Sequence, residues 1–370
     1  MIWKRIGGIC VAVLLVLGLN ACDTDDADGT TGSPSLDADV SSQENTKPTE
    51  RQNITVEPEA PVVLDLSKED DGILLFRLPV EQGDAQSVLL GDEELRIIPQ
   101  GEQTMIHTTS LKPGEHTMTL QREDQNIIFP VYVVTMEISS AADLRKATKL
   151  TDAALGYYIL TNNIDCSDLD EPVCFLDHSA FETDLGQNRD GFRGSFNGMG
   201  YTISNLKLPE NGLFGCIGSS GIVRNLGLKN ISSDESDFFA ICRDSAGSIS
   251  QVYVQGEFSR VLRASYSPTN KLENIVAEAV RPDAMLCQHI ATVDTDGYSV
   301  SDIHALIMVG ENAQISGWSR TEQFSSLTAD ADLRVFSGST RDSIPAVAAE
   351  DGFNGYWDIT SGYPIFISSM

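Results

Sequence analysis

The chain has 370 residues, with 54 acidic and 25 basic side chains and a formal net charge of -29. So acidic a chain is poorly suited to binding nucleic acid, because phosphate backbones are neutralised by Lys and Arg. Hydrophobic residues make up 41% of the sequence, which favours a globular protein, and the length allows two or three domains of about 100 to 200 residues each.

Residues 1–21 have the pattern of a secretory signal. Two basic residues, Lys4 and Arg5, precede a short apolar run, as in signal peptides and unlike membrane-spanning helices. The tetrapeptide Leu19-Asn20-Ala21-Cys22 follows and resembles the lipobox of bacterial lipoproteins, whose Cys is acylated and becomes the mature N-terminus. The resemblance implies acyl chains such as palmitate on Cys22 and an extracytoplasmic location on a bacterial membrane, at the outer membrane or cell surface. The alternative is an ordinary signal peptide with an incidental cysteine.

Residues 22–57 are predicted to form a disordered acidic tether. The segment is rich in Asp, Ser, Thr, Gly and Pro and has no apolar periodicity. It therefore cannot bury enough apolar surface to fold. The acidic residues at its start are interpreted as solvated charge rather than as a calcium site.

Residues 58–135 predict a small immunoglobulin-like β-sandwich. Short apolar runs such as VVLDL, GILLFRLPV and IIFPVYVVT show partial period-two alternation and are bounded by Gly, Pro and Asp. The turn and strand LKPGEHTMTLQ, residues 111–121, resembles the late turn and strand of bacterial immunoglobulin-like domains. The sequence of this segment contains no cysteine, so an antibody-type disulfide is excluded. Its simplest role is a spacer between the membrane and the next domain.

A short capping helix is predicted at the start of residues 136–370. Ser139 and Ser140 precede Asp143 in the manner of a helix N-terminus, and LRKATKL continues the helical pattern. A strand, GYYILTNNID, follows at residues 156–165. Because the open end of a solenoid exposes both its core and its strand edges, we expect the helix to cover that end.

An apolar pattern recurs five times after this strand. Its central positions, spaced by 20, 26, 23 and 28 residues, are Leu206, Leu226, Val252, Ile275 and Ile303. Each has a further apolar residue three positions before it and another two positions after it. A period this short, in residues that favour strands, predicts a right-handed parallel β-helix in which neighbouring strands lie about 4.8 Å apart.

The residue before each central position is polar. These residues are Asn205, Asn225, Gln251, Asn274 and Asp302. In register, they predict a ladder of side chains that hydrogen-bond one another between successive turns of the β-helix, as stacked Asn and Gln do in cross-β arrays. Such a ladder satisfies its own donors, so we interpret it as structural rather than as a binding strip.

The repeats resemble the GLUG repeats of bacterial surface proteins. The resemblance rests on GYYILTNNID, on FRGSFNGMGYTISNL at residues 192–206, on GLFG at 212–215 and on IVRNLGL at 222–228. The sequence FNGYWDITSGYPIF, residues 353–366, is similar to the segment that closes such domains. The resemblance implies a β-helix that accompanies adhesins and proteases alike. The proteases carry a separate HExxH zinc motif, which this sequence lacks.

Five cysteines remain beyond the signal and the lipobox. Outside the cytoplasm they can oxidise, and Cys166 and Cys174 are predicted to close a short loop with a disulfide. Cys216 and Cys242 each lie ten residues before a central position, so we expect them to stack on neighbouring turns, as a disulfide or as an unbonded pair. Cys287 is expected in the core.

Asp294, Asp296 and Asp302 are the best candidates for a calcium site, and with His304 for polysaccharide cleavage. A polar loop leading into a strand is the simpler interpretation, because the spacing falls one residue short of an EF-hand loop. We therefore expect no cofactor and a non-catalytic binding or adhesion module, anchored by lipid, for a glycan or a surface protein. Two alternatives stay open: a polysaccharide lyase or glycoside hydrolase of the β-helix type, and a passive structural surface protein.

Overall fold

The computed structural model describes residues 51–80, 87–100, 102–109, 111–176, 191–265, 271–282 and 284–290, and short strands at 302–309, 314–316, 333–336, 357–358 and 365–366. The predictions for the signal, for Cys22 and for the tether up to residue 50 lie outside the described residues. So do those for Asp294 and Asp296, for the side chains of Asn274, Cys287, Asp302 and His304, and for most of the predicted closing segment.

Strands dominate the described residues, which confirms the predicted all-β class. One α-helix lies among them, α1 (Ala141–Ala147), where the sequence predicts a short helix. Its N-cap is Ser140, whose hydroxyl accepts the Asp143 N–H at 3.2 Å. Leu144 and Ala147 are buried, so one side of the helix packs on the core.

The N-terminal module, as we call strands β1 to β9, contains two sheets. The larger has the order β1-β9-β8-β4-β5, with β2 also paired to β9, and the smaller has the order β3-β7-β6. Their bounds are β1 (Gln52–Thr55), β2 (Val62–Asp65), β3 (Ile73–Phe76), β4 (Ser87–Leu90), β5 (Glu93–Leu95), β6 (Ile97–Gln100), β7 (Gln103–His107), β8 (Gly114–Gln121) and β9 (Gln125–Val134), with the 3-10 turn η1 (Leu66–Lys68) after β2.

Alternation builds the core of this module, as period-two strands with one buried face require. On β9 every second residue from Ile127 to Val133 is buried, and these four residues pack in one cluster with residues from the smaller sheet such as Leu74. The first strand, β1, pairs in parallel with β9 although it lies inside the predicted tether. The tether prediction was therefore too long, because exposed Gln, Asn and Thr side chains still permit an edge strand.

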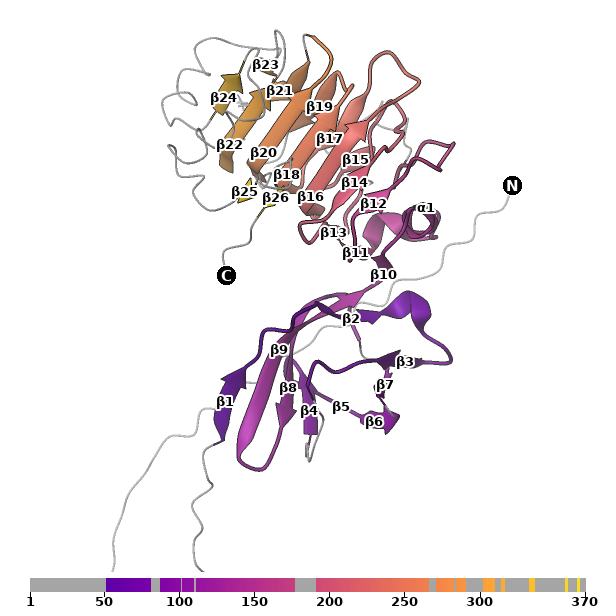
Figure 1. Ribbon diagram of the computed structural model, residues 1–370, viewed down its shortest axis with the longest axis vertical. Coiled ribbons are helices and arrows are strands. Elements are labelled where there is room, and N and C mark those ends of the chain that lie inside the picture. The colour runs from indigo at the N-terminus through magenta and orange to yellow at the C-terminus, as the bar shows by residue number, and fades with distance from the viewer. Residues whose placement is uncertain are drawn as a thin grey trace, which may run out of the picture. The chain divides into compact units, whose positions relative to one another are not determined.

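The parallel module, as we call β10 and the strands up to β24, is built from two all-parallel sheets (Figure 1). The first contains β10 (Met136–Ile138), β11 (Tyr157–Leu160), β13 (Ser195–Asn197), β16 (Ile222–Ile231), β18 (Ser248–Gly256), β20 (Lys271–Ala279), β22 (Asp302–Val309) and β24 (Leu333–Phe336), with β12 (Ile164–Asp165) and β14 (Thr202–Ser204). The second contains β15 (Cys216–Ile217), β17 (Phe239–Ser245), β19 (Arg260–Ser265), β21 (Met285–Ile290) and β23 (Gln314–Ser316). From β15 onward, consecutive strands alternate between the two sheets.

Two short elements complete the description: the 3-10 turn η2 (Ala153–Leu155) before β11, and an antiparallel pair near the C-terminus, β25 (Trp357–Asp358) with β26 (Ile365–Phe366). The antiparallel pair falls within the predicted closing segment. Its few described residues place two short strands there and nothing more.

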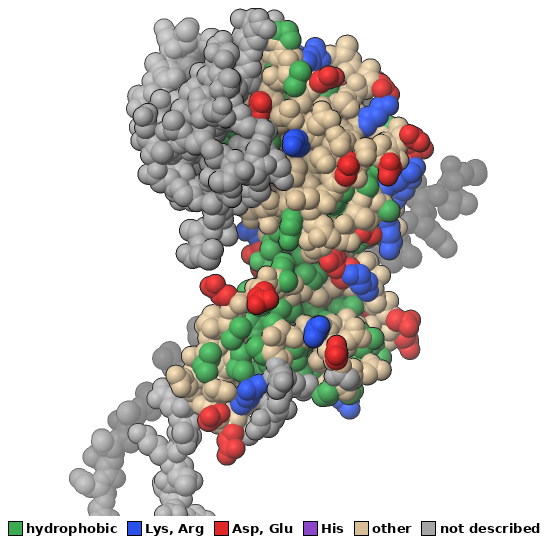
Figure 2. Space-filling view, viewed as in Figure 1, with side chains coloured by type: hydrophobic (Ala, Val, Ile, Leu, Met, Phe, Trp, Pro, Cys, Tyr) green, Lys and Arg blue, Asp and Glu red, His purple; other side chains and the backbone are tan. Residues whose placement is uncertain are grey.

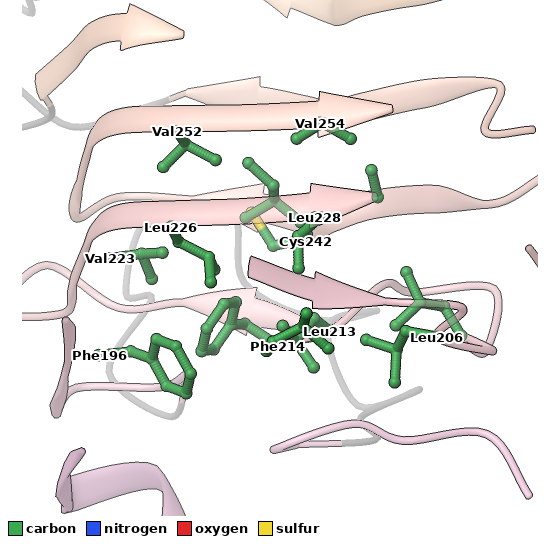
Figure 3. Close-up of a cluster of buried hydrophobic side chains, with 14 of the residues drawn as sticks. Phe196, Leu206, Leu213, Phe214, Val223, Leu226, Leu228, Cys242, Val252 and Val254 are labelled. Atoms are coloured by element: carbon green, nitrogen blue, oxygen red, sulfur yellow. The ribbon is translucent and has the colours of Figure 1, made fainter. Parts of the chain in front are cut away.

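The predicted apolar columns occur on three consecutive strands of the first sheet. Leu226, Val252 and Ile275 pair in register on β16, β18 and β20, and the flanking apolar positions pair likewise. All three side chains are buried (Figure 3 shows the first two). Because each apolar residue contacts its counterparts on the strands before and after it, the columns fix the register of the sheet.

The first and fifth predicted positions were out of register. Ile203 pairs with Leu228, not with Val223, because Phe196 already pairs with Val223 and the turn between β13 and β14 holds two additional residues. At the other end Ile303 pairs with Leu272, so Leu306 and not Ile303 continues the column of Ile275. The sequence of residues 300–308 carries two overlapping copies of the apolar spacing, and the sequence alone favoured the wrong one.

An aromatic cluster fills the beginning of the parallel module. Phe175, Phe192, Phe196 and Phe214 are buried, and the ring of Phe214 stacks on Phe175 with 5.4 Å between centroids. The rings of Phe192 and Phe196 approach Phe214 to 5.0 and 5.4 Å. Figure 3 shows Phe196 and Phe214 among the aliphatic side chains of the following strands. This cluster closes the core next to α1.

Candidate functional site

The predicted polar ladder is two ladders on separate parts of the first parallel sheet. In one, Asn205 donates to Asp165 at 2.8 Å and Asn230 donates to Asn205 at 2.6 Å. The backbone N–H of Asn230 donates in turn to the side-chain oxygen of Gln255 at 2.7 Å. The hydrogen bond from Asn205 lowers the pKa of Asp165. The sequence predicted that Asn205 stacks on Asn225. Asn205 instead hydrogen-bonds with Asp165 and Asn230.

The second ladder begins at Asn225, another of the predicted residues. Asn225 donates to Asn197 at 3.0 Å, and Gln251 is its counterpart on β18, between two pairs of residues that are in register. Asn274 holds the same backbone position on β20, whereas Asp302 pairs with Lys271 and is displaced from the column. The registry error for Asp302 follows from the error for Ile303.

A backbone requirement explains why amides recur at these positions. Asn205, Asn225 and Asn230 have φ values of 55°, 52° and 52°, and Gln251 has 53°. This left-handed conformation is costly for most L-residues but tolerated by Asn, whose short side chain hydrogen-bonds locally. The sequence signal was a repeated Asn inside an apolar strand pattern, and its conformational meaning was missed.

A second polar site centres on Glu115, an outward-facing residue of β8. Its carboxylate accepts a hydrogen bond from the Tyr157 hydroxyl at 3.0 Å and from the Asn197 amide at 3.5 Å, and it forms an ion pair with Arg224. The three donors come from β11, β13 and β16 of the parallel module. Burial and the neighbouring Tyr132 raise the pKa of Tyr157 to about 12, so its phenol stays protonated and able to donate at neutral pH. Sequence reasoning missed this site, because its members are far apart in the chain.

A third polar site is the acidic loop of residues 232–237. Lys207 pairs with Asp234 at 2.6 Å and Arg260 pairs with Asp237 at 2.5 Å, while Arg281 donates to the backbone carbonyl of Ser236. The ion pair with Arg260 lowers the pKa of Asp237. The loop thus contacts basic side chains from separate turns of the chain, and these contacts hold the turns together.

We looked for clusters of metal-ligating side chains among the described residues. Among them, no group of three or more His, Cys, Asp and Glu side chains is placed to hold a metal ion. On the face shown in Figure 2, acidic and basic side chains are interspersed rather than gathered in one patch.

The cysteine predictions need two corrections. Cys166 is a free thiol, so the predicted disulfide with Cys174 is not formed. Cys216 pairs with Asp244 rather than with Cys242, whose partner on β19 is Leu262. The loop after β15 is two residues longer than the loop after β17, and this difference moves Cys216 out of line with Cys242.

Cys166 is expected to resist alkylation in the native chain. Its side chain is 1% exposed, and burial with the adjacent Asp165 raises the pKa of the thiol from an ordinary 9.0 to about 12. The folded state favours the protonated form of the Cys166 thiol. The contribution of this thiol to the free energy of unfolding is therefore complete below pH 9 and is lost as the pH rises toward 12.

The measurement is iodoacetamide labelling at pH 8, followed by peptide mass spectrometry. We expect little label on Cys166 in the native chain and complete label after unfolding without any reductant. A Cys166→Ser chain controls for peptide assignment. If reductant were needed before Cys166 reacted in the unfolded chain, the residue would be in a disulfide and the free-thiol assignment would be wrong.

The chain defined by these features is an all-β protein with two parallel sheets and no described metal site. No family model and no solved structure matches it. It is similar to a segment of halomucin from Haloquadratum walsbyi, with 35% identity over 126 residues, which is 32% of this chain and 1% of halomucin. The chain thus corresponds to a small part of that protein's length. No helix among the described residues is long and apolar enough to cross a membrane.

Proposed function

We propose that this protein is a non-catalytic binding or adhesion module displayed outside a bacterial cell. In this proposal the N-terminal module is an immunoglobulin-like sandwich and the parallel module is a right-handed β-helix of the GLUG type. The observation that carries it is the alternation of consecutive parallel strands between two sheets with apolar columns in register. Solenoids of this kind present extended surfaces for binding.

The chemistry of the polar sites supports binding over catalysis. Amides of both ladders donate hydrogen bonds between strands. Asp234 and Asp237 of loop 232–237 form ion pairs with Lys207 and Arg260. A polysaccharide-cleaving enzyme needs two carboxylates that converge on one bond within about 5 to 10 Å, each available to the substrate. We therefore place the ligand, a glycan or a surface protein, on the outer faces and loops of the β-helix.

The location follows from the N-terminal sequence. We propose that acylation of Cys22 anchors the protein to a bacterial membrane, at the outer membrane or the cell surface, with residues 23–50 as an acidic tether. The similarity to a segment of halomucin favours a surface-type protein. The large negative charge favours an exposed, soluble body over association with anionic lipid.

The binding proposal is tested by probing arrays of glycans and surface proteins with the full chain, labelled at its C-terminus. We expect saturable binding to a defined subset, lost after the chain is heat-unfolded. Binding to no component would favour the passive structural protein. Release of shortened sugars from a bound polysaccharide would favour the lyase or hydrolase.

The anchor is tested separately by replacing Cys22 with serine. We expect the variant to leave the membrane fraction, because the acyl chains supply most of the membrane affinity. The matched control is Cys10→Ser, which changes a cysteine inside the apolar run of the signal and should leave the protein in the membrane fraction. If Cys22→Ser stayed in the membrane fraction, the lipid anchor would be excluded.

A further inference from the structure

We propose that Glu115 locks the N-terminal module and the parallel module into one rigid arm. This inference concerns how the two modules are joined and does not depend on the ligand or on the membrane anchor. It rests on three features of the junction: the donors that converge on Glu115, a second carboxylate with the opposite arrangement, and the shortness of the connection.

The convergence on Glu115 is unusual for an exposed side chain. Glu115 lies on β8 opposite Tyr132 on β9, and its side chain is 46% exposed. It nevertheless receives donors from three different strands of the parallel module: Tyr157, Asn197 and Arg224. Asn197 and Arg224 are register partners on neighbouring strands, so their side chains project from the same side of the sheet. One carboxylate therefore contacts side chains from three neighbouring strands of the parallel module at once.

The charge of Arg224 requires the Glu115 carboxylate as its partner. Its side chain is 30% exposed, and burial lowers the pKa of its guanidinium, which means that the charge is partly removed from water. A partly buried cation is costly unless an anion compensates it. Because the compensating anion comes from the N-terminal module, separation of the modules would leave Arg224 without it.

A second carboxylate holds the junction from the opposite direction. Glu137, on β10 of the parallel module, accepts from Lys68 of the N-terminal module at 2.7 Å and from the Thr161 hydroxyl at 2.8 Å. Lys68 also pairs with the buried Asp65 at 3.2 Å. The two charged contacts lie at separate points, and each module supplies the anion of one of them. Together they prevent the modules from rotating against each other as well as from separating, whereas one contact alone would act as a pivot.

The connection between the modules is a single residue. β9 ends at Val134 and β10 begins at Met136, so Thr135 is the whole linker. Its backbone N–H donates to the Tyr157 carbonyl at 2.8 Å, and its hydroxyl accepts from the Tyr157 N–H at 3.0 Å. Flexible domain boundaries are exposed and make few contacts. Here the linker is hydrogen-bonded to the same tyrosine whose hydroxyl binds Glu115, so linker and lock form one unit.

The test is the rotational correlation time of each module, measured by backbone 15N relaxation in the full chain. We expect one common value for both modules in the unchanged chain. In Glu115→Ala the N-terminal module should tumble faster than the parallel module, by up to about twofold given their difference in size, because the remaining Lys68–Glu137 contact then acts as a pivot. The charge-swapped chain with Glu115→Arg and Arg224→Glu should recover a common value at least in part.

Glu94→Gln is the matched control, because Glu94 is an exposed glutamate on β5 of the same sheet, and it should keep the common value. Retained amide chemical shifts within each module of Glu115→Ala would show that both still fold. Independent tumbling of the modules in the unchanged chain would overturn the proposal. A common value in a folded Glu115→Ala chain would overturn the role of Glu115. Should that variant lose its native shifts, Arg224→Met, which removes the charge but keeps the apolar stem, gives the same decision.

Discussion

Replacement of Phe214 by alanine is expected to lower the free energy of unfolding by about 3 to 5 kcal/mol. The Phe214 side chain is fully buried, and its ring contacts those of Phe175, Phe192 and Phe196 with centroids 5.0 to 5.4 Å apart. Truncation removes these contacts and leaves a cavity. The three neighbouring rings are themselves packed and cannot move in to fill it. Geometry of this kind, stacked and edge-to-face, adds about 0.5 to 1.5 kcal/mol per aromatic pair to the burial itself.

The measurement is urea unfolding of the full chain, followed by tryptophan fluorescence and circular dichroism. Phe214→Leu is the matched control, and its loss should be smaller because leucine still fills part of the space. Leu155→Ala, at a residue 53% exposed, should change stability by no more than about 0.5 kcal/mol. A loss below about 1 kcal/mol for Phe214→Ala, with an unchanged slope, would contradict a tightly packed aromatic cluster.

The period of the apolar pattern made the register of three strands in the parallel module predictable. Positions such as Leu226, Val252 and Ile275 pair as the spacing predicts, because a buried residue in a parallel sheet must face its counterpart on the neighbouring strand. The short helix was predictable for a local reason, since Ser140 and Asp143 satisfy backbone and side-chain groups at its first turn.

The register near the beginning of the parallel module could not be predicted, because turn lengths are not encoded in the apolar spacing. Two additional residues between β13 and β14 move Asn205 beside Asn230, and two more after β15 move Cys216 beside Asp244. Polar turns differ in length without changing the pattern of the strands they join. Counting from a central position therefore fails whenever a turn lies between the residue and its reference.

The polar sites illustrate the same limit at longer range. Glu115 and Arg224 are 109 residues apart in sequence. They lie in two different motifs, LKPGEHTMTLQ and IVRNLGL, and neither motif indicates that the two residues meet. Their contact depends on how two separately folded sheets meet, which side-chain periodicity does not specify. The amides were recognisable as a repeat in the sequence. That Asn225 and its counterparts also adopt a left-handed backbone conformation was not suggested by hydrogen bonding alone.

Gly215→Ala is expected to destabilise the chain by about 3 kcal/mol or more, since two separate costs combine at this position. Gly215 has a φ of 63°, in the left-handed region, and a Cβ atom added there would lie 1.9 Å from the backbone carbonyl oxygen of Leu176. The added methyl group cannot rotate away from a backbone atom, so the backbone at Leu176 would have to move away from Gly215. The hydrogen bond from the Phe175 N–H to the Leu213 carbonyl, 2.8 Å long, would be strained by that movement.

Gly91→Ala separates the two costs. Gly91 has a nearly identical φ of 60°, but nothing lies within 4 Å of an added Cβ, so its substitution carries only the backbone term of about 1 to 2 kcal/mol. The difference between the two variants in urea unfolding therefore measures the contact with Leu176, and equal losses would show that this segment moves aside freely. The contact with Leu176 also explains the last residue of the sequence GLFG. Phe214 fills the aromatic cluster, and the residue after it is glycine because another part of the backbone occupies the place of a side chain.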